Sequence, residues 1–154
     1  MFQDIYNFHK FTDILYSGGM PTEAQLEDAA NYVHYVINLA PHTVGNALQN
    51  EESIVKRLGM NYINIPVVWD TPTEEKLGEF MDIMDKLQHE TVLVHCQANF
   101  RASSFISMYH ILRKGKDIDK SVKVMREIWD DEVYPIWHEF ILDVIADFRK
   151  QTSV

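Results

Sequence analysis

The sequence predicts an α/β fold in which helices flank both faces of a central, mostly parallel sheet of four to five strands. Short runs rich in Val, Ile, Leu and Tyr alternate with longer runs whose apolar residues recur at helical spacing, as far as residue 112. This alternation is typical of a parallel sheet that is covered by helices. Because there is no repeat, linker or low-complexity segment, we expect one domain over residues 1–154.

In the first part of the chain, start and stop signals set the element boundaries. Gly18-Gly19-Met20-Pro21 ends the first strand, Thr22 with Gln25 forms a capping-box pattern, and Gly59 closes a polar helix. The elements expected here are a lid over residues 1–12, strands at 13–17, 35–39 and 61–65, and helices at 22–32 and 51–58.

The second part predicts one more strand and four helices. Thr73 caps a helix whose apolar stripe runs from Leu77 to Leu87. A buried strand at 91–94 leads through a loop into an apolar helical run at 105–112. Two further amphipathic helices follow Gly115, with stripes over 118–129 and 136–148.

Composition and charge exclude several classes of function. No apolar run approaches the roughly 18 residues that span a bilayer, and the N-terminus does not resemble a signal peptide. A net charge of −9 disfavours nucleic acid and anionic membranes as partners. The single cysteine cannot form an internal disulfide, and no Cys/His spacing resembles a metal site. We therefore expect a cytoplasmic protein that uses no metal and no cofactor, in an environment that keeps a thiol reduced.

Residues 91–104 are the most informative stretch. A buried strand delivers Cys96, the only cysteine, into a loop at the start of a helix, and Arg101 follows. Helix N-termini present free N–H groups and favour negative charge, which stabilises both a bound anion and a thiolate. A guanidinium suits phosphate. The stretch thus offers a reachable nucleophile and an oxyanion cradle.

Ligands of such sheets lie beyond the carboxyl ends of the strands. The loops that follow three of the expected strands carry His42, Asp70 and 96–101. Each of these residues also has a purely structural interpretation: Cys96 as a small buried hydrophobe, Asp70 as a turn residue and His42 as a solvated loop residue.

The run Val94-His95-Cys96, with Arg101 and Ser103, resembles the active-site loop of the cysteine-dependent protein tyrosine phosphatase superfamily. Residues 16–22, 36–39 and 65–73 look like its small bacterial dual-specificity-like branch, so the resemblance covers roughly residues 12–112. It implies a tyrosine-phosphatase-like fold and hydrolysis of a phosphorylated protein or a small phosphomonoester. The oligomeric state is not implied.

The resemblance also implies residue roles. Cys96 would form a phosphocysteine, Asp70 would act as general acid and base, and Ser103 would hydrogen-bond the sulfur. Arg101 and the loop amides would hold the phosphoryl oxygens, and His95 would orient the loop. The residues that would bind substrate are Gln97, Ala98, Asn99, Phe100 and Arg101. Without the resemblance, His95 could be a core histidine and Ser103 an ordinary first-turn helix residue.

The spacing departs from the family pattern, which has five residues between Cys and Arg with Gly in the middle. Here four residues separate Cys96 from Arg101, and none is Gly. Either the loop is one residue tighter, which we favour, or Arg101 is displaced by one helical step. Asn99 can tolerate the left-handed backbone for which the family uses Gly. A smaller ring of amides should fit phosphate less well, so we expect weak activity.

Two other functions remain open. Rhodanese-type sulfurtransferases resemble this fold locally and use a shorter Cys loop, although they have no need of Asp70 or of the segment 66–72. The third possibility is a catalytically weak phosphate-binding module.

Overall fold

The computed structural model describes residues 1–153, and its centre is a five-stranded sheet in the order β1-β2-β5-β3-β4. Only β1 and β2 are antiparallel; the other neighbours are parallel. The strands are β1 (His9–Thr12), β2 (Leu15–Gly18), β3 (Tyr35–Asn38), β4 (Asn61–Asn64) and β5 (Val92–His95). The predicted α/β class, with a mostly parallel sheet, is confirmed.

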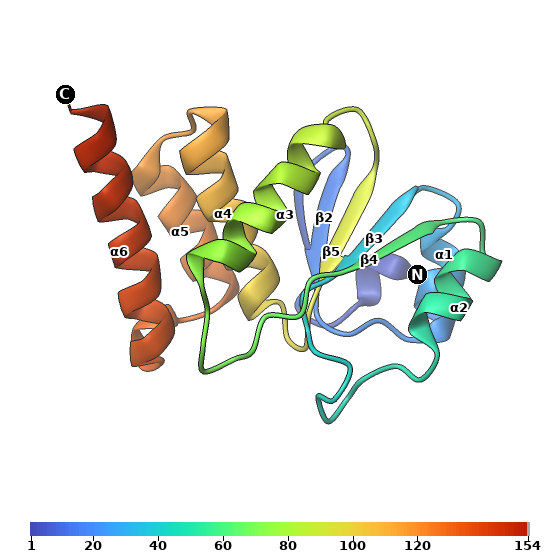
Figure 1. Cartoon of the computed structure of the whole chain (residues 1–154). Coiled ribbons are helices and arrows are strands. Elements are labelled where there is room, and N and C mark those ends of the chain that lie inside the picture. Colours follow the sequence, from blue (N-terminus) through green and yellow to red (C-terminus); the bar gives the residue numbers. More distant parts are fainter. Residues whose placement is uncertain (154) are drawn as a thin grey trace.

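Helices cover both faces of this sheet (Figure 1). One face carries η1, α1 and α2, whose apolar residues form one core cluster with β-strand residues; α3 to α6 contribute to the larger cluster on the other face. The helices are η1 (Phe2–Asp4), α1 (Glu23–Ala29), α2 (Glu51–Arg57), α3 (Glu74–Lys86), α4 (Phe100–Lys114), α5 (Ile118–Ile128), η2 (Asp131–Val133) and α6 (Pro135–Thr152).

The strand β5 is the centre of the molecule. All four of its residues are buried, and it pairs in parallel with β2 on one side and β3 on the other. Its last residue, His95, lies opposite Gly18 and Asn38. A continuous apolar run is what a strand buried on both faces requires. The carboxyl end of β5 therefore opens where the neighbouring strands also end.

Most of the predicted boundary signals are confirmed. Thr22 and Gln25 form a reciprocal capping box, and the Thr73 hydroxyl accepts a hydrogen bond from the Lys76 N–H. Gly59 has a φ of +88° directly after α2, a left-handed conformation that favours glycine. Each of these residues acts on the backbone of its immediate neighbours, so the conformation that it favours does not depend on the rest of the fold.

The prediction of a lid was wrong for the second part of residues 1–12, because His9–Thr12 forms the edge strand β1, whose residues are alternately half-buried and exposed. The helix after the cysteine contains the predicted apolar run at 105–112 but begins earlier, at Phe100, so Arg101 lies in its first turn. Both segments are polar or mixed in composition, and tertiary packing decides their conformation.

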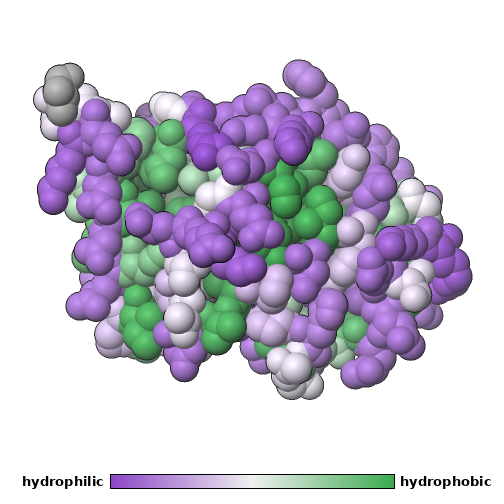
Figure 2. All heavy atoms as spheres, viewed as in Figure 1, coloured by the Kyte–Doolittle hydropathy of each residue, from purple (hydrophilic) through white to green (hydrophobic). Residues whose placement is uncertain are grey.

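The face of the molecule shown in Figure 2 is mostly hydrophilic. On the face viewed in Figure 2, purple residues cover most of the molecule, and hydrophobic residues show between them, most clearly beside α3. Within residues 1–153, no helix has the length and hydropathy that crossing a bilayer would require.

A buried carboxylate connects the C-terminal helices. Asp131 in η2 is fully buried and accepts hydrogen bonds from Arg126 Nε (3.0 Å) and His138 Nδ1 (2.9 Å). Burial by itself would raise the pKa of Asp131, but the hydrogen bonds and charges of His138 and Arg126 outweigh it and hold the pKa below its usual value. The network fixes the segment that leads to Tyr134.

We expect Asp131→Asn to lower the free energy of unfolding by about 2 kcal/mol, because it removes the charged partner of two hydrogen bonds. A folded-state pKa below the unfolded value means that this stabilisation is present above about pH 4 and lost as pH falls further. Urea unfolding at pH 7 and pH 3 should therefore show a smaller difference between wild type and variant at pH 3 than at pH 7. Asp130→Asn is the matched control, and a loss as large as that of Asp131→Asn would contradict the assignment.

Candidate active site

The end of β5 delivers Cys96 into a short loop that becomes α4. Asn99 precedes the helix with a φ of +71°, a left-handed conformation that asparagine tolerates better than most residues. Its side-chain amide donates to the Asn7 carbonyl (2.7 Å), which ties the turn to the N-terminal segment. The tight turn brings Arg101 into the first turn of α4, next to Cys96.

The carbonyl groups of the Cys loop are bonded outward to surrounding segments. His95 Nδ1 donates to the Cys96 carbonyl (3.3 Å), and Asn7 Nδ2 donates to the Ala98 carbonyl (3.1 Å). The Asn99 carbonyl accepts from the Ser103 N–H and hydroxyl, as the start of the helix demands.

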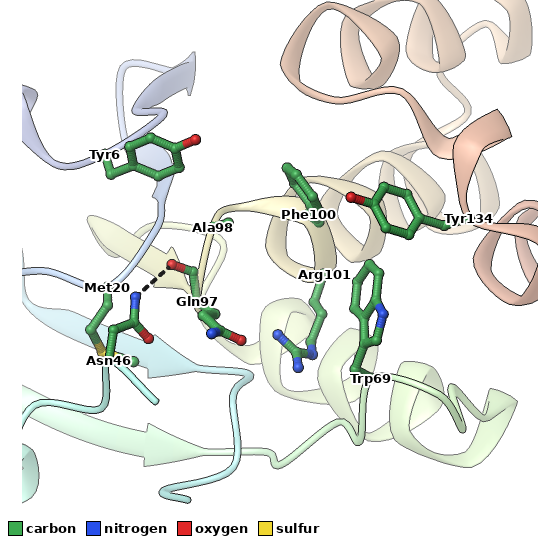
Figure 3. Close-up of a pocket in the computed structure, with 9 residues that line it drawn as sticks. All are labelled: Tyr6, Met20, Asn46, Trp69, Gln97, Ala98, Phe100, Arg101 and Tyr134. Carbon is green, nitrogen blue, oxygen red and sulfur yellow. Dashed lines mark hydrogen bonds between the residues drawn. The ribbon is translucent and has the colours of Figure 1, made fainter. Parts of the chain in front are cut away.

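The Gln97 carbonyl is held by two donors. The Met20 N–H donates to it at 3.2 Å, and the Asn46 side-chain amide donates at 3.2 Å, as the dashed line in Figure 3 shows. Gly19 makes this approach possible, since a Cβ there would lie 3.0 Å from the Gln97 carbonyl oxygen. The glycine pair that ends β2 therefore also lets the chain pass against the Cys loop.

The N–H groups of the loop are used differently. Within residues 1–153, the N–H groups of Gln97, Ala98, Phe100 and Arg101 donate to no other group of the protein. Unpaired N–H groups at the start of a helix are donors for an anion. The carbonyl groups of the loop thus bind the surrounding protein, whereas its N–H groups are free to bind a ligand.

Within the part of the chain that the structure describes, Arg101 is the one cation that lines the adjoining cavity, although it is only 4% exposed. Its guanidinium carbon lies 5.2 Å from the centroid of the Trp69 ring, a cation–π contact that Figure 3 shows. Burial lowers the pKa of Arg101, while the charge and hydrogen bond of Cys96 raise it. Its Nε is buried and has no hydrogen-bond partner. A buried guanidinium with an unused donor is typical of an anion-binding site.

The cavity in front of this loop has a volume of about 450 Å³. Aromatic side chains from four separate segments form much of its wall, and Figure 3 shows three of them, Trp69, Phe100 and Tyr134, near Arg101. The lining residues are Tyr6, Met20, Asn46, Trp69, Gln97, Ala98, Phe100, Arg101 and Tyr134.

Cys96 itself is fully buried and is not among the residues that line the cavity. The expectation of a reachable thiol is therefore not met in this structure. The reason is packing: Cys96 belongs to the large core cluster, and the loop and Arg101 lie next to it.

The other predicted residues are distributed unevenly. Asp70 is exposed, accepts a hydrogen bond from the Thr71 hydroxyl (3.1 Å) and does not line the cavity. Ser103 donates its hydroxyl proton to the Asn99 carbonyl (2.6 Å), so its hydrogen bond goes to the helix backbone and not to the sulfur. His42 is exposed, contacts the Tyr62 hydroxyl (2.9 Å) and lies outside the cavity lining. The catalytic roles of Asp70 and Ser103 stay predictions.

Sequence reasoning missed several residues of this site. Glu51 is buried and contacts His95 Nε2, yet it begins a helix whose first residues, Glu51 to Ser53, are all polar. Tyr6 and Tyr134 reach the cavity from opposite ends of the chain. Trp69 could have been found from the sequence, because a tryptophan in a loop next to the candidate catalytic Asp70 indicates a residue of the site. Among residues 1–153, no group of three or more His, Cys, Asp or Glu side chains could hold a metal ion.

Comparison with known proteins places this geometry in a family. Residues 6–134 match the family model described as a dual-specificity-type phosphatase fused to NAD⁺ kinase. The comparison with curated proteins gave no match. Among solved structures, a candidate phosphatase of the DUF442 group from Shewanella putrefaciens CN-32 is 34% identical. The alignment covers 94% of this chain and 92% of that chain, with a TM-score of 0.83.

More distant structures share the fold. TpbA of P. aeruginosa, in a complex with phosphotyrosine, is 16% identical with a TM-score of 0.74, over 96% of this chain and 90% of that one. The core catalytic domain of the PP-IP phosphatase SIW14 from S. cerevisiae, in complex with citrate, is 13% identical with a TM-score of 0.74, over 96% of this chain and 94% of that one. With the family match and the 34% identical relative, this chain belongs to the cysteine-based tyrosine and dual-specificity phosphatase superfamily.

Proposed function

We propose that this protein hydrolyses phosphomonoesters through a phosphocysteine on Cys96. The observation that carries the proposal is the position of Arg101. This buried residue lines the cavity beside the free N–H groups of the loop, lies next to Cys96, and has an Nε without a hydrogen-bond partner. These donors suit the charge that spreads over the equatorial oxygens of a transferring phosphoryl group. The phosphatase family of this chain supports the same conclusion.

The reaction has two steps. The Cys96 thiolate attacks phosphorus, so an S–P bond forms while the bond from phosphorus to the leaving oxygen breaks, and Asp70 gives that oxygen a proton. A water then attacks phosphorus, Asp70 takes its proton, and the S–P bond breaks to release phosphate. Arg101 and the N–H groups of 97–101 hold the phosphoryl oxygens throughout.

Two features support weak activity. The loop has one residue fewer than the family pattern, and the thiol is fully buried, so the loop must open or shift before phosphorus can reach it. Asp70 must also turn from its exposed position toward the leaving group. Each rearrangement costs free energy that a preorganised site would not need.

The cavity favours a substrate with one phosphoryl group on an aromatic or apolar carrier. Four of its nine lining residues are aromatic, and Arg101 is its one cation among the described residues. A chain with a net charge of −9 would also repel a polyphosphorylated ligand. Phosphotyrosine, which the related fold of TpbA binds, fits these properties; a phosphorylated protein and a small aryl phosphate present the same group.

A sulfurtransferase or a non-catalytic phosphate-binding module would behave differently. Thiocyanate formation from thiosulfate and cyanide, without phosphate release, would indicate the sulfurtransferase. Vanadate binding without any turnover of aryl phosphates would indicate the module. Phosphate release that depends on Cys96 supports the phosphatase.

We expect Cys96→Ser to lower kcat/KM for p-nitrophenyl phosphate by roughly 10³-fold or more, because a serine hydroxyl is not ionised at neutral pH. Because Cys96 is the only cysteine, mass spectrometry after iodoacetamide treatment reports on this thiol alone. Vanadate should protect it from alkylation in the wild type. Unchanged phosphate release in the variant would refute the phosphocysteine.

We expect Asp70→Asn to lower kcat/KM, which reports the step that expels the leaving group, by roughly 10²-fold or more for an alkyl phosphate, which needs a proton on its leaving oxygen, and much less for p-nitrophenyl phosphate. Steady-state rates on the two substrates give the comparison. Asp13→Asn, an exposed carboxylate outside the cavity lining, serves as control. Equal losses on both substrates, or no loss on either, would remove Asp70 from the proton transfer.

We expect Asn99→Ala to lower the free energy of unfolding by about 1–2 kcal/mol and to weaken vanadate binding. Alanine disfavours a φ of +71° and cannot donate to the Asn7 carbonyl. Asn99→Gly should keep the backbone conformation and therefore bind vanadate more tightly than the alanine variant. Thermal unfolding and vanadate inhibition measure the two effects, and equal binding by both variants would contradict the role assigned to the turn.

A further inference from the structure

Glu51 is a buried carboxyl group for which the proposed reaction has no direct use. It is the first residue of α2, is only 4% exposed, and contacts His95 Nε2 through Oε2. Its other oxygen accepts a hydrogen bond from the Asn38 amide at 3.2 Å. A buried carboxyl group is retained at a cost unless its partners satisfy it. Both oxygens of Glu51 have such partners.

Hydrogen-bond chemistry fixes one proton of this cluster. A carbonyl oxygen can only accept, so the contact of His95 Nδ1 with the Cys96 carbonyl (3.3 Å) requires a proton on Nδ1. The contact between His95 Nε2 and Glu51 then contains one further proton, which the two groups share. In either arrangement of that proton, Glu51 keeps His95 in the form that donates from Nδ1.

Asn38 connects this pair to the sheet and to the surface. It is the last residue of β3 and lies opposite His95 in the parallel pairing with β5. Its amide also donates to the Tyr62 hydroxyl (3.2 Å), which contacts His42 Nε2 (2.9 Å). Burial, and then the charge of Glu51, raise the pKa of Tyr62. The carboxyl group of Glu51 is therefore held by Asn38 through one oxygen and by His95 through the other.

The Cys96 carbonyl is one of the groups that the scaffold turns away from the loop's free N–H donors. A histidine with its proton on Nε2 alone could not hold this carbonyl. Releasing it would free the peptide that links Cys96 to Gln97, and with it the first N–H of the proposed anion cradle.

We propose that Glu51 is a positioning residue of the active site: through His95 it holds the Cys96 carbonyl outward and so keeps the loop in its anion-binding conformation. This role rests on the proposed function, but its first consequence, the proton on His95 Nδ1, is measurable without any substrate.

The test combines imidazole ¹⁵N NMR with vanadate inhibition of aryl phosphate hydrolysis. In the wild type, His95 should show a protonated Nδ1 at neutral pH. Glu51→Ala should lose this signature and bind vanadate roughly 10-fold to 100-fold more weakly, as expected when a loop moves by about an ångström. The matched control is Glu52→Ala, because Glu52 is exposed and pairs only with Lys56. It should change neither quantity.

Glu51→Gln separates positioning from charge. Its amide can donate to Nε2 while its oxygen still accepts from Asn38, so Nδ1 should stay protonated, and vanadate should bind more tightly than to Glu51→Ala. If Glu51→Ala fails to fold, the wild-type and Glu51→Gln spectra decide. An unprotonated Nδ1 in the wild type, or a folded Glu51→Ala variant with wild-type vanadate affinity, overturns the proposal. A wild type that neither hydrolyses aryl phosphates nor binds vanadate refutes the proposed function, while the tautomer result still stands.

Discussion

The site depends on the way in which the scaffold bonds the carbonyl groups of the Cys loop. Donors from His95, Met20, Asn46 and Asn7 take the carbonyls of Cys96, Gln97 and Ala98, and they come from segments far apart in the sequence. A peptide group whose carbonyl is anchored to the scaffold leaves its N–H to another partner. This constraint converts an ordinary strand-to-helix connection into an array of unused donors.

The second support of the site is aromatic. Trp69 packs against Arg101 on one side and stacks on Trp137 from α6 at a ring distance of 5.3 Å. Trp137 also donates its indole N–H to the Trp69 carbonyl (2.6 Å), so the C-terminal helix holds the loop that carries Asp70. Phe100 stacks on Trp129 at 4.6 Å. These contacts hold the guanidinium of Arg101 among aromatic rings, which have few groups that could accept its hydrogen bonds in place of a bound anion.

Local donors have to overcome an unfavourable overall field. The chain carries a net charge of −9, which works against an anion that approaches from a distance. Screening at physiological ionic strength confines that repulsion to about 8 Å. Inside the cavity, a buried guanidinium and several N–H groups act where water competes less, and each is worth more there than at the surface.

The sequence by itself determined the fold class and most helix caps, and it showed that Asn99 could tolerate a left-handed backbone, because these features follow from apolar periodicity and from residues that act on their immediate neighbours. Only the tertiary structure decided that Glu51 is buried against His95, that Trp69, Tyr6 and Tyr134 meet at one cavity, and that Cys96 lies beneath the loop. The physical reason is distance along the chain. Periodicity shows that a residue faces some core or some solvent, but pairing strands and packing helices select which distant residue it meets.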